Sequence, residues 1–312
     1  MRTGTRILTI ALLAGLTSVS SIQADEPAEI AVAEETRPTL TLFQAVVLGF
    51  VEGATEYLPV SSTGHLLIAE ELLGMNGDTR QKEAAHSLAI CIQCGAILAV
   101  LVLYFGRIRQ MLTGMIGRDA DGLRLLINLL VAFFPAAVIG LLFNDWIREH
   151  LFGVLPVAIA LFVGGVIIFL QAMGRKKTDA EQGKEVIQMT WRDALFVGTM
   201  QCLAFWPGLS RSLATILGCR WVNLRMMAAV EFSFLLGLVT LTAATAYEGL
   251  KNGAAMIADY GMAMPLVALI TAFFAAVVSV RFMVGVLSQF GLTPFGYYRI
   301  LLAFACLWWL QI

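Results

Sequence analysis

A short polar stretch, EGATEYLPVSSTGH at residues 52–65, lies between two strongly apolar segments. Glu52 and Glu56 are four residues apart, so on a helix both carboxylates project from one face. A charged acid at bilayer depth costs about 2.5–3.5 kcal/mol on insertion scales unless it faces a polar cavity or a cation. The pair therefore predicts a site for a divalent cation, Mg²⁺ or Ca²⁺, which carboxylate oxygens bind and which in turn holds phosphate.

The residues after Pro59 add groups that bind or activate a phosphate. Ser61 or Ser62 is a natural N-cap where the helix restarts, with Thr63 in its first turn. Free amides at such a helix start attract anions. His65, one turn further on, can act as a general acid or base near pH 7. Each side chain alone also has a structural explanation, as a cap or a packed histidine, but their grouping favours chemistry.

A second stretch, PGLSRSLAT at residues 207–215, supplies the opposite charge. Arg211 follows a proline-glycine turn at an expected helix start, where its guanidinium can hold a phosphate through two hydrogen bonds. Ser210, Ser212 and Thr215 would surround it with hydroxyl groups. The alternative for Arg211 is snorkelling to the membrane surface. Together the two stretches predict a site for a phosphorylated group at the membrane.

The composition places these stretches in an integral membrane protein. Of 312 residues, 59% are hydrophobic and only 14% are charged, and the mean hydropathy is +0.80, far from soluble usage. The net charge of −1 gives no basic field of the kind that nucleic-acid binding needs, so nucleic acid is excluded as a partner.

Six apolar runs are long enough to cross a bilayer, which takes about 20 residues. They are residues 87–106, 125–144, 151–174, 232–247 with its flanks, 260–280, and 282–312, the last interrupted only by Arg299. Two further regions, 40–74 and 191–218, are broken midway by Pro59 and Pro207, so each is expected to be a re-entrant helical hairpin. The predicted fold is an all-α polytopic membrane protein.

The two broken regions resemble one another in spacing. Glu52 to Ser61 and Gln201 to Ser210 both span nine positions (61 − 52 and 210 − 201), each with a proline between. We therefore predict an inverted repeat within one membrane domain, residues 40–312: each half, about 40–174 and about 188–312, is a hairpin plus three transmembrane helices. The hairpins would then meet near the midplane, where inverted repeats place their sites.

The N-terminus predicts export. Arg2 and Arg6 precede an apolar run, and a cleavage site follows Ala24, so residues 1–24 resemble a signal peptide, with an uncleaved anchor as the alternative. Residues 25–39 form an acidic segment expected to be disordered. Basic residues concentrate in the loops near 107–124 and 175–184, which predicts that these loops are cytoplasmic and that both termini of the mature chain lie outside.

EGATEYLPVSSTGH and PGLSRSLAT resemble the two signature motifs of the undecaprenyl-diphosphate phosphatase, or bacitracin-resistance, family, with further similarity in CIQCGAILAV, QCLAFWPG and AVEFSFLL. The resemblance extends from about Thr41 to Ile312. It implies hydrolysis of the terminal phosphate of a C55 isoprenoid diphosphate, an enzyme that recycles a lipid carrier for peptidoglycan synthesis and confers bacitracin resistance, in the bacterial inner membrane. By resemblance, Glu52 and Glu56 are the metal-associated acids.

The same resemblance assigns the other site residues. Ser62 is a candidate nucleophile or phosphate ligand, His65 a catalytic base, acid or nucleophile, and Arg211 the diphosphate anchor. The pocket for the phosphate would be lined by Ser61, Thr63, Ser210, Ser212 and Thr215. The chain departs from the family in having Leu213 where the second motif commonly has glycine, and in its signal-like extension.

Other chemistries fit less well. A lipid phosphatase with a histidine nucleophile needs a histidine after the Ser-Arg pair, and His65, His86 and His150 all precede Arg211. GLSRS lacks the second glycine of a serine-hydrolase elbow. Glu231 is expected to pair with Arg211 or Arg225. A lipid-phosphate transporter built on the same hairpins is the alternative function, and the sequence leaves open whether copies associate into a homo-oligomer.

Overall fold

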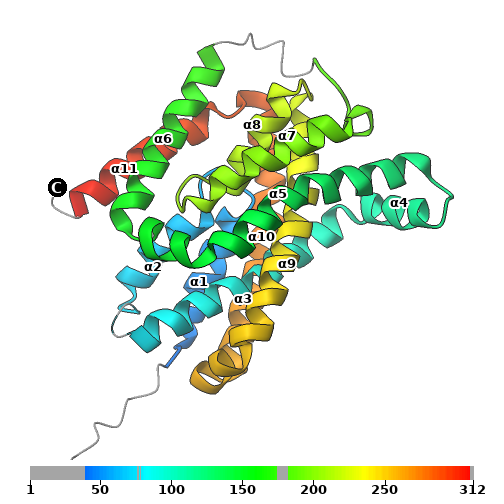
Figure 1. Cartoon of the computed structure of the whole chain (residues 1–312). Helices are drawn as coiled ribbons and strands as arrows, with labels where there is room; N and C mark the ends of the chain where they lie inside the picture. Colours follow the sequence, from blue (N-terminus) through cyan, green and yellow to red (C-terminus); the bar gives the residue numbers. More distant parts are fainter. Residues whose placement is uncertain (1–38, 76, 78, 174–181, 310–312) are drawn as a thin grey trace, which may run out of the picture. The chain divides into compact units, whose positions relative to one another are not determined.

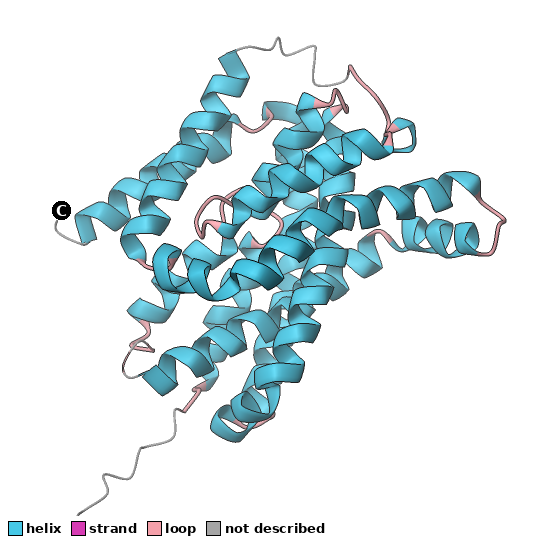
Figure 2. Cartoon of the chain, in the orientation of Figure 1, coloured by secondary structure: helices cyan, strands magenta, loops and turns pink. Residues whose placement is uncertain are grey.

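The computed structural model describes residues 39–75, 77, 79–173 and 182–309. Throughout these ranges the chain is helical, apart from loops and one isolated β-bridge between Lys184 and Leu224 (Figure 2). The predicted signal peptide lies outside the described residues, as does all but the last residue of the predicted acidic segment. The prediction of an all-α membrane protein is confirmed.

Among the residues that the structure describes, five helices are long and apolar enough to cross a membrane. They are α3 (Thr79–Leu103), α5 (Ala120–Leu151), α6 (Val154–Met173), α9 (Met226–Tyr260) and α10 (Ala263–Phe290). A further helix, α11 (Thr293–Trp309), has 17 residues and takes the place of the sixth predicted span. The helix α4 (Phe105–Met115) lies in the region that we predicted to be a basic loop.

The predicted boundaries of the last two spans are wrong. We placed the break at Arg281, but α10 continues through Arg281 and ends at Gly291, which has φ 63°. Arg281 is exposed, and a long side chain of this kind can carry its charge away from the apolar surface without ending the helix. Glycine in the left-handed conformation does end helices, and Gly261 (φ 69°) closes α9 in the same way.

The two broken regions are pairs of short helices. The first is α1 (Leu42–Thr55) with α2 (Ser62–Leu72), and the second is α7 (Trp191–Gln201) with α8 (Arg211–Trp221). A short 3₁₀ helix, η3 (Cys202–Phe205), follows α7, and another, η2 (Val186–Gln188), precedes it. With 11 to 14 residues, each helix measures about 16–21 Å. None can cross a bilayer core of about 30 Å alone, which supports the hairpin interpretation.

Each of the main packed pairs joins one helix of the first predicted half to one helix of the second. α1 packs on α10 as α7 packs on α5, α3 contacts α10 as α9 contacts α5, and α6 lies beside α11 (Figure 1). The contacts of α1 and α7 are close because small residues face each other. A Cβ added to Gly49 or Gly53 would overlap the backbone of Ala268 or Ala272, and one on Gly198 would overlap Ala132. The inverted orientation of the halves stays a prediction.

Candidate active site

The two hairpin tips meet in the interior and form one polar cavity. The cavity has a volume of about 90 Å³, room for several water molecules. Its polar side chains come from both tips and from α3, with backbone of the second tip between them. It is lined by Glu56, Ser61, Ser62, Thr63, Gln93, Ala204, Pro207, Gly208, Ser210, Arg211 and Leu241.

Each tip ends in a serine that caps the following helix. Ser61 (φ 73°) caps α2 by accepting from the amide of Gly64, and Ser210 (φ 78°) caps α8 by accepting from the amide of Leu213. Both serines have the left-handed backbone that few residues other than glycine adopt.

The tips are joined by hydrogen bonds. The amide of Gly208 donates to Oγ of Ser61 at 3.1 Å, and Oγ of Ser212 donates to the carbonyl of Leu58 at 2.8 Å. In both bonds the second tip donates and the first tip accepts. The two motifs, about 150 residues apart in the sequence, therefore form a single site, as predicted.

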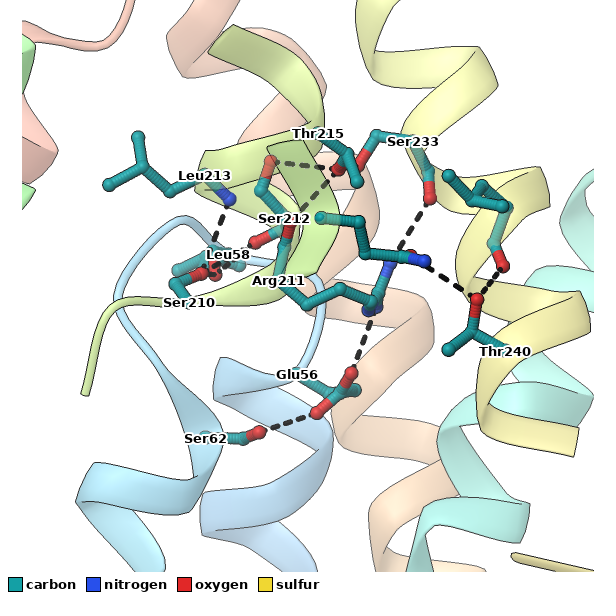
Figure 3. A network of polar contacts seen from close by, with 12 residues as sticks. Glu56, Leu58, Ser62, Ser210, Arg211, Ser212, Leu213, Thr215, Ser233 and Thr240 are labelled. Carbon is teal, nitrogen blue, oxygen red and sulfur yellow. Dashed lines mark hydrogen bonds and ion pairs between the residues drawn. The ribbon is translucent and has the colours of Figure 1, made fainter. Parts of the chain in front are cut away.

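Glu56 is the centre of the charged network (Figure 3). It accepts from Nη2 of Arg211 at 2.9 Å and from the hydroxyl of Ser62. Glu56 and Ser62 are buried, and the side chain of Arg211 is only 11% exposed. A buried pair of opposite charges with a hydroxyl on the acid is an arrangement in which the acid can take a proton from the hydroxyl.

Arg211 is held by Tyr57 of the first motif and by residues of α9 that neither motif contains. Its Nη1 donates to the carbonyl of Ser233 at 3.1 Å, and its guanidinium carbon lies 5.4 Å from the ring centre of Tyr57, a cation–π distance. Gly237 leaves the space that the guanidinium fills, since a Cβ there would overlap it. Ser233 belongs to AVEFSFLL in α9, a segment that resembles the family outside its two signature motifs, and Gly237 follows directly after it.

Glu52 differs sharply from Glu56. Its side chain is fully buried, and neither carboxylate oxygen has a hydrogen-bond partner. Buried polar atoms without partners are rare and call for a ligand or a proton. Among the described residues no group of three or more His, Cys, Asp or Glu side chains could hold a metal alone. Mg²⁺ is commonly bound by one or two carboxylates together with phosphate and water oxygens, so the two glutamates fit a cation whose other ligands come from substrate and water.

His65 is not paired with Ser62 in the structure. Its Nδ1 lies 2.7 Å from the carbonyl of Ser61, and its Nε2 lies 2.6 Å from the hydroxyl of Tyr298. Because a carbonyl only accepts, Nδ1 carries the proton and Nε2 accepts from the tyrosine. The rings of His65 and Tyr298 stack with an interplanar angle of 4°. Ser62 donates to Glu56 instead.

Two of the predicted phosphate ligands face away from the cavity. Ser212 bonds to the first tip, and Thr215 bonds to the carbonyls of Arg211 and Ser212 and to the hydroxyl of Ser233. Neither is among the residues that line the cavity, whereas Ser61, Ser62, Thr63 and Ser210 are. The hydroxyls of Ser212 and Thr215 thus connect the second tip to its surroundings.

Glu231 has a different partner from those we predicted. It forms an ion pair with Arg107 of α4, while Arg225 pairs with Glu185 at 2.7 Å and Arg211 pairs with Glu56. The prediction that Glu231 pairs with Arg211 or Arg225 is wrong because α4, a helix within the predicted loop, brings Arg107 to it.

Arg299 lies outside both motifs and is not among the predicted site residues. It is fully buried in α11 and donates to backbone carbonyls of both tips. Its sequence signal was present, because an ionisable residue inside an apolar run is by default a functional candidate. Tyr298, its neighbour, had no such signal.

The chain is similar to known proteins over most of its length. The chain is 46% identical over 268 residues to an undecaprenyl-diphosphatase of Sorangium cellulosum, covering 85% of each chain. It is 43% identical over 259 residues to undecaprenyl-diphosphatase 2 of Rhodospirillum rubrum, covering 83% of this chain and 91% of that one. It is 42% identical to an undecaprenyl-diphosphatase of Pseudomonas aeruginosa, covering 83% and 90%. The model of the family described as bacitracin resistance protein BacA matches residues 45–305, which include both hairpins. The chain belongs to this bacitracin resistance protein family.

Proposed function

We propose that this chain hydrolyses undecaprenyl diphosphate to undecaprenyl phosphate and inorganic phosphate. The observation that carries the proposal is the network of Ser62, Glu56 and Arg211 in a cavity between two hairpin tips. It combines a hydroxyl, an acid that can take its proton and a cation for phosphate, in a family whose relatives are named for this reaction. Such an enzyme regenerates the lipid carrier of peptidoglycan synthesis and raises resistance to bacitracin.

The resting network explains how the site can stay charged inside the membrane. Without substrate, Arg211 and Glu56 neutralise each other, which lowers the cost of burying both. A bound diphosphate would compete for the guanidinium, whose planar fork suits two phosphate oxygens. Glu56 would then lose its ion pair and keep the hydroxyl of Ser62 as its partner while the substrate is in place.

In the route through Ser62, Oγ attacks the terminal phosphorus while Glu56 takes its proton. The bond from that phosphorus to the bridging oxygen breaks, and the bridging oxygen leaves with the electron pair on the lipid monophosphate. Water then cleaves the phosphoserine, releasing inorganic phosphate and returning the hydroxyl. In the alternative route, water attacks directly and Ser62 only orients it. His65 is a candidate base for that water, which requires its bond with Tyr298 to open.

A divalent cation, Mg²⁺ or Ca²⁺, would be held by Glu52 and Glu56. The orphaned oxygens of Glu52, one helical turn from Glu56, suit it. When bound, the cation would supply positive charge that stabilises the charge building on the phosphate during transfer. The free amides at the starts of α2 and α8 act in the same sense.

We also propose that the enzyme lies in the bacterial inner membrane with both termini outside and the cavity open to the outer face. The basic loops support this orientation. An isoprenoid diphosphate is the lipid partner. The helices Met226–Tyr260 and Ala263–Phe290 and the three other long apolar helices supply the membrane-spanning surface.

The test is phosphate release from C55 diphosphate by the purified full chain in detergent, with and without a chelator. Glu56→Gln and Arg211→Ala should abolish release. The matched controls are Glu149→Gln, whose side chain is 80% exposed, and Arg109→Ala on the exposed face of α4; both should keep native turnover. A folded native chain that binds the lipid but releases no phosphate with any divalent metal would refute the proposal. The transporter alternative would then be tested in sealed vesicles.

A further inference from the structure

We propose that Arg299 is a positioning residue that holds the two hairpin tips in the alignment needed for diphosphate hydrolysis. The inference rests on the proposed function but concerns a residue that neither motif contains. Arg299 lies in the middle of α11, a helix that contributes no residue to the lining of the cavity.

Arg299 contacts the same position in both tips. Nη1 donates to the carbonyl of Pro59 at 3.1 Å, and Nη2 donates to the carbonyl of Gly208 at 2.7 Å. Pro59 is two residues before the cap Ser61, and Gly208 is two residues before the cap Ser210. One guanidinium therefore bonds to corresponding backbone atoms of the two turns, and a planar group with several fixed donors can do this where an ammonium cannot.

A third contact fixes the guanidinium itself. Nη2 also donates to the carbonyl of Ala160 in α6 at 3.0 Å, and Gly164, one turn later, leaves the space that the side chain occupies, since a Cβ there would overlap it. The pair α6 and α11 thus forms a fixed support, and both tips are tied to it through one side chain.

Within the described part of the chain, Arg299 is buried without an opposite charge, so its hydrogen bonds to the tips must offset the cost of burying the guanidinium. Its exposed fraction is 0%, and among the described residues no carboxylate pairs with it. Burying a charge without an opposite charge is unfavourable unless its hydrogen bonds are well satisfied. Three carbonyls accept from its two terminal nitrogens, whereas Nε has no partner among the residues that the structure describes. The bond from the Gly208 amide to Ser61 Oγ closes the same junction from the other side.

Alignment of the tips controls the chemistry because the reacting groups lie on different tips. Ser62 and Glu56 belong to the first tip and Arg211 to the second. A displacement of about 1 Å between such groups can lower a rate by about 100-fold while leaving binding of the substrate almost unchanged. Arg299 should therefore act on kcat more than on KM.

Two variants test the alignment, one by changing Arg299 itself and the other by changing the residue that makes room for it. Arg299→Lys keeps the charge and loses the fork, and Gly164→Ala keeps Arg299 and removes its space. Both should lower kcat for C55 diphosphate by about 10- to 100-fold, with KM within about threefold of native. Arg281→Lys and Gly285→Ala are the controls, because Arg281 is exposed and an added Cβ at Gly285 meets open space. Both controls should keep native kcat.

Hydrogen exchange of the full chain separates alignment from general stability. In both variants the amides of Gly64 and Gly208, which bond to Ser61 Oγ, should exchange faster, while amides in α3 and α9 stay native. Native kcat in Arg299→Lys, or faster exchange throughout the chain with unchanged kcat per folded molecule, would overturn the inference. If the native chain itself releases no phosphate, the proposed function fails, and native exchange at the tips would still overturn the role of Arg299.

Discussion

At the residue scale, the most informative feature is the partner of Ser62. The hydroxyl donates to Glu56, and His65 is engaged by Ser61 and Tyr298. The acid that the spacing with Glu52 assigned to a metal thus also serves as the base in the proposed route. Glu56 accepts hydrogen bonds from both Arg211 and Ser62. Binding of the substrate to Arg211 would therefore affect the acid that activates the hydroxyl.

Ser62→Ala is expected to lower kcat by about 100-fold or more, because it removes the hydroxyl that Glu56 would deprotonate. Binding of the lipid diphosphate should stay close to native, since Arg211 is unaffected. Rates are measured as phosphate release, with Ser288→Ala at the exposed end of α10 as the control. A phosphoserine trapped by rapid acid quenching in the native enzyme would assign the nucleophile, and native turnover in Ser62→Ala would contradict this role.

Arg211→Lys is expected to lower kcat/KM by about 10- to 100-fold, although the charge is kept. Arg211 bonds to Glu56 and to the carbonyl of Ser233 at the same time, and an ammonium lacks the fork for this and for bidentate phosphate. Steady-state kinetics over a range of lipid concentrations provide the measurement. Turnover equal to that of the native chain would argue against a bidentate anchor.

At the element scale, the hairpins are held where they are by glycine-mediated contacts. α1 lies against α10 and α7 against α5 with almost no side chain between the backbones. Short helices inside a membrane gain little from the hydrophobic effect, so close packing of this kind is what fixes them. These contacts therefore position Glu56 at the end of α1 and the second tip, which follows α7.

Gly53→Ala is expected to lower the thermal unfolding temperature in detergent, because the added methyl overlaps Ala272. Overpacking of this kind costs about 1–3 kcal/mol. Gly285→Ala in α10 should leave the temperature unchanged or raise it, since alanine is the better helix former and its methyl meets open space. Equal effects of the two substitutions would contradict the close approach of α1 and α10.

The sequence predicts the parts of the site that lie within one motif, but not the contacts between residues far apart in the sequence. The carboxylate pair, both caps and Arg211 follow from spacing within the two motifs. The structure brings Glu56, both caps and Arg211 to the lining of one cavity, whereas Glu52 is not part of that lining. The contacts of His65 with Tyr298 and of Arg299 with Pro59 join residues 233 and 240 positions apart. No local pattern reports which distant helix lies beside a tip. The helix α4 was missed because its arginines predicted a loop.

At the scale of the whole molecule, orientation in the membrane is the main prediction. After replacement of the native cysteines, Leu250→Cys at the far end of α9 should react with a membrane-impermeant thiol reagent in intact spheroplasts, and Ile116→Cys after α4 should react only after lysis. Both positions are well exposed, at 91% and 64%. We expect this pattern because the loops with many basic residues, such as the region of α4, lie on the cytoplasmic side of a membrane. The reverse labelling pattern would invert the proposed topology.

The pairing of α1 with α10 also has a consequence for biosynthesis. The packing partner of Gly49 is Ala268, which the ribosome adds 219 residues later (268 − 49). At about 5–20 residues per second, the first hairpin waits on the order of 10–40 s for that partner. During this interval Glu52 and Glu56 enter the membrane without Arg211, Arg299 or the second tip. The active site can therefore assemble only at the end of translation, as the last two helices are inserted.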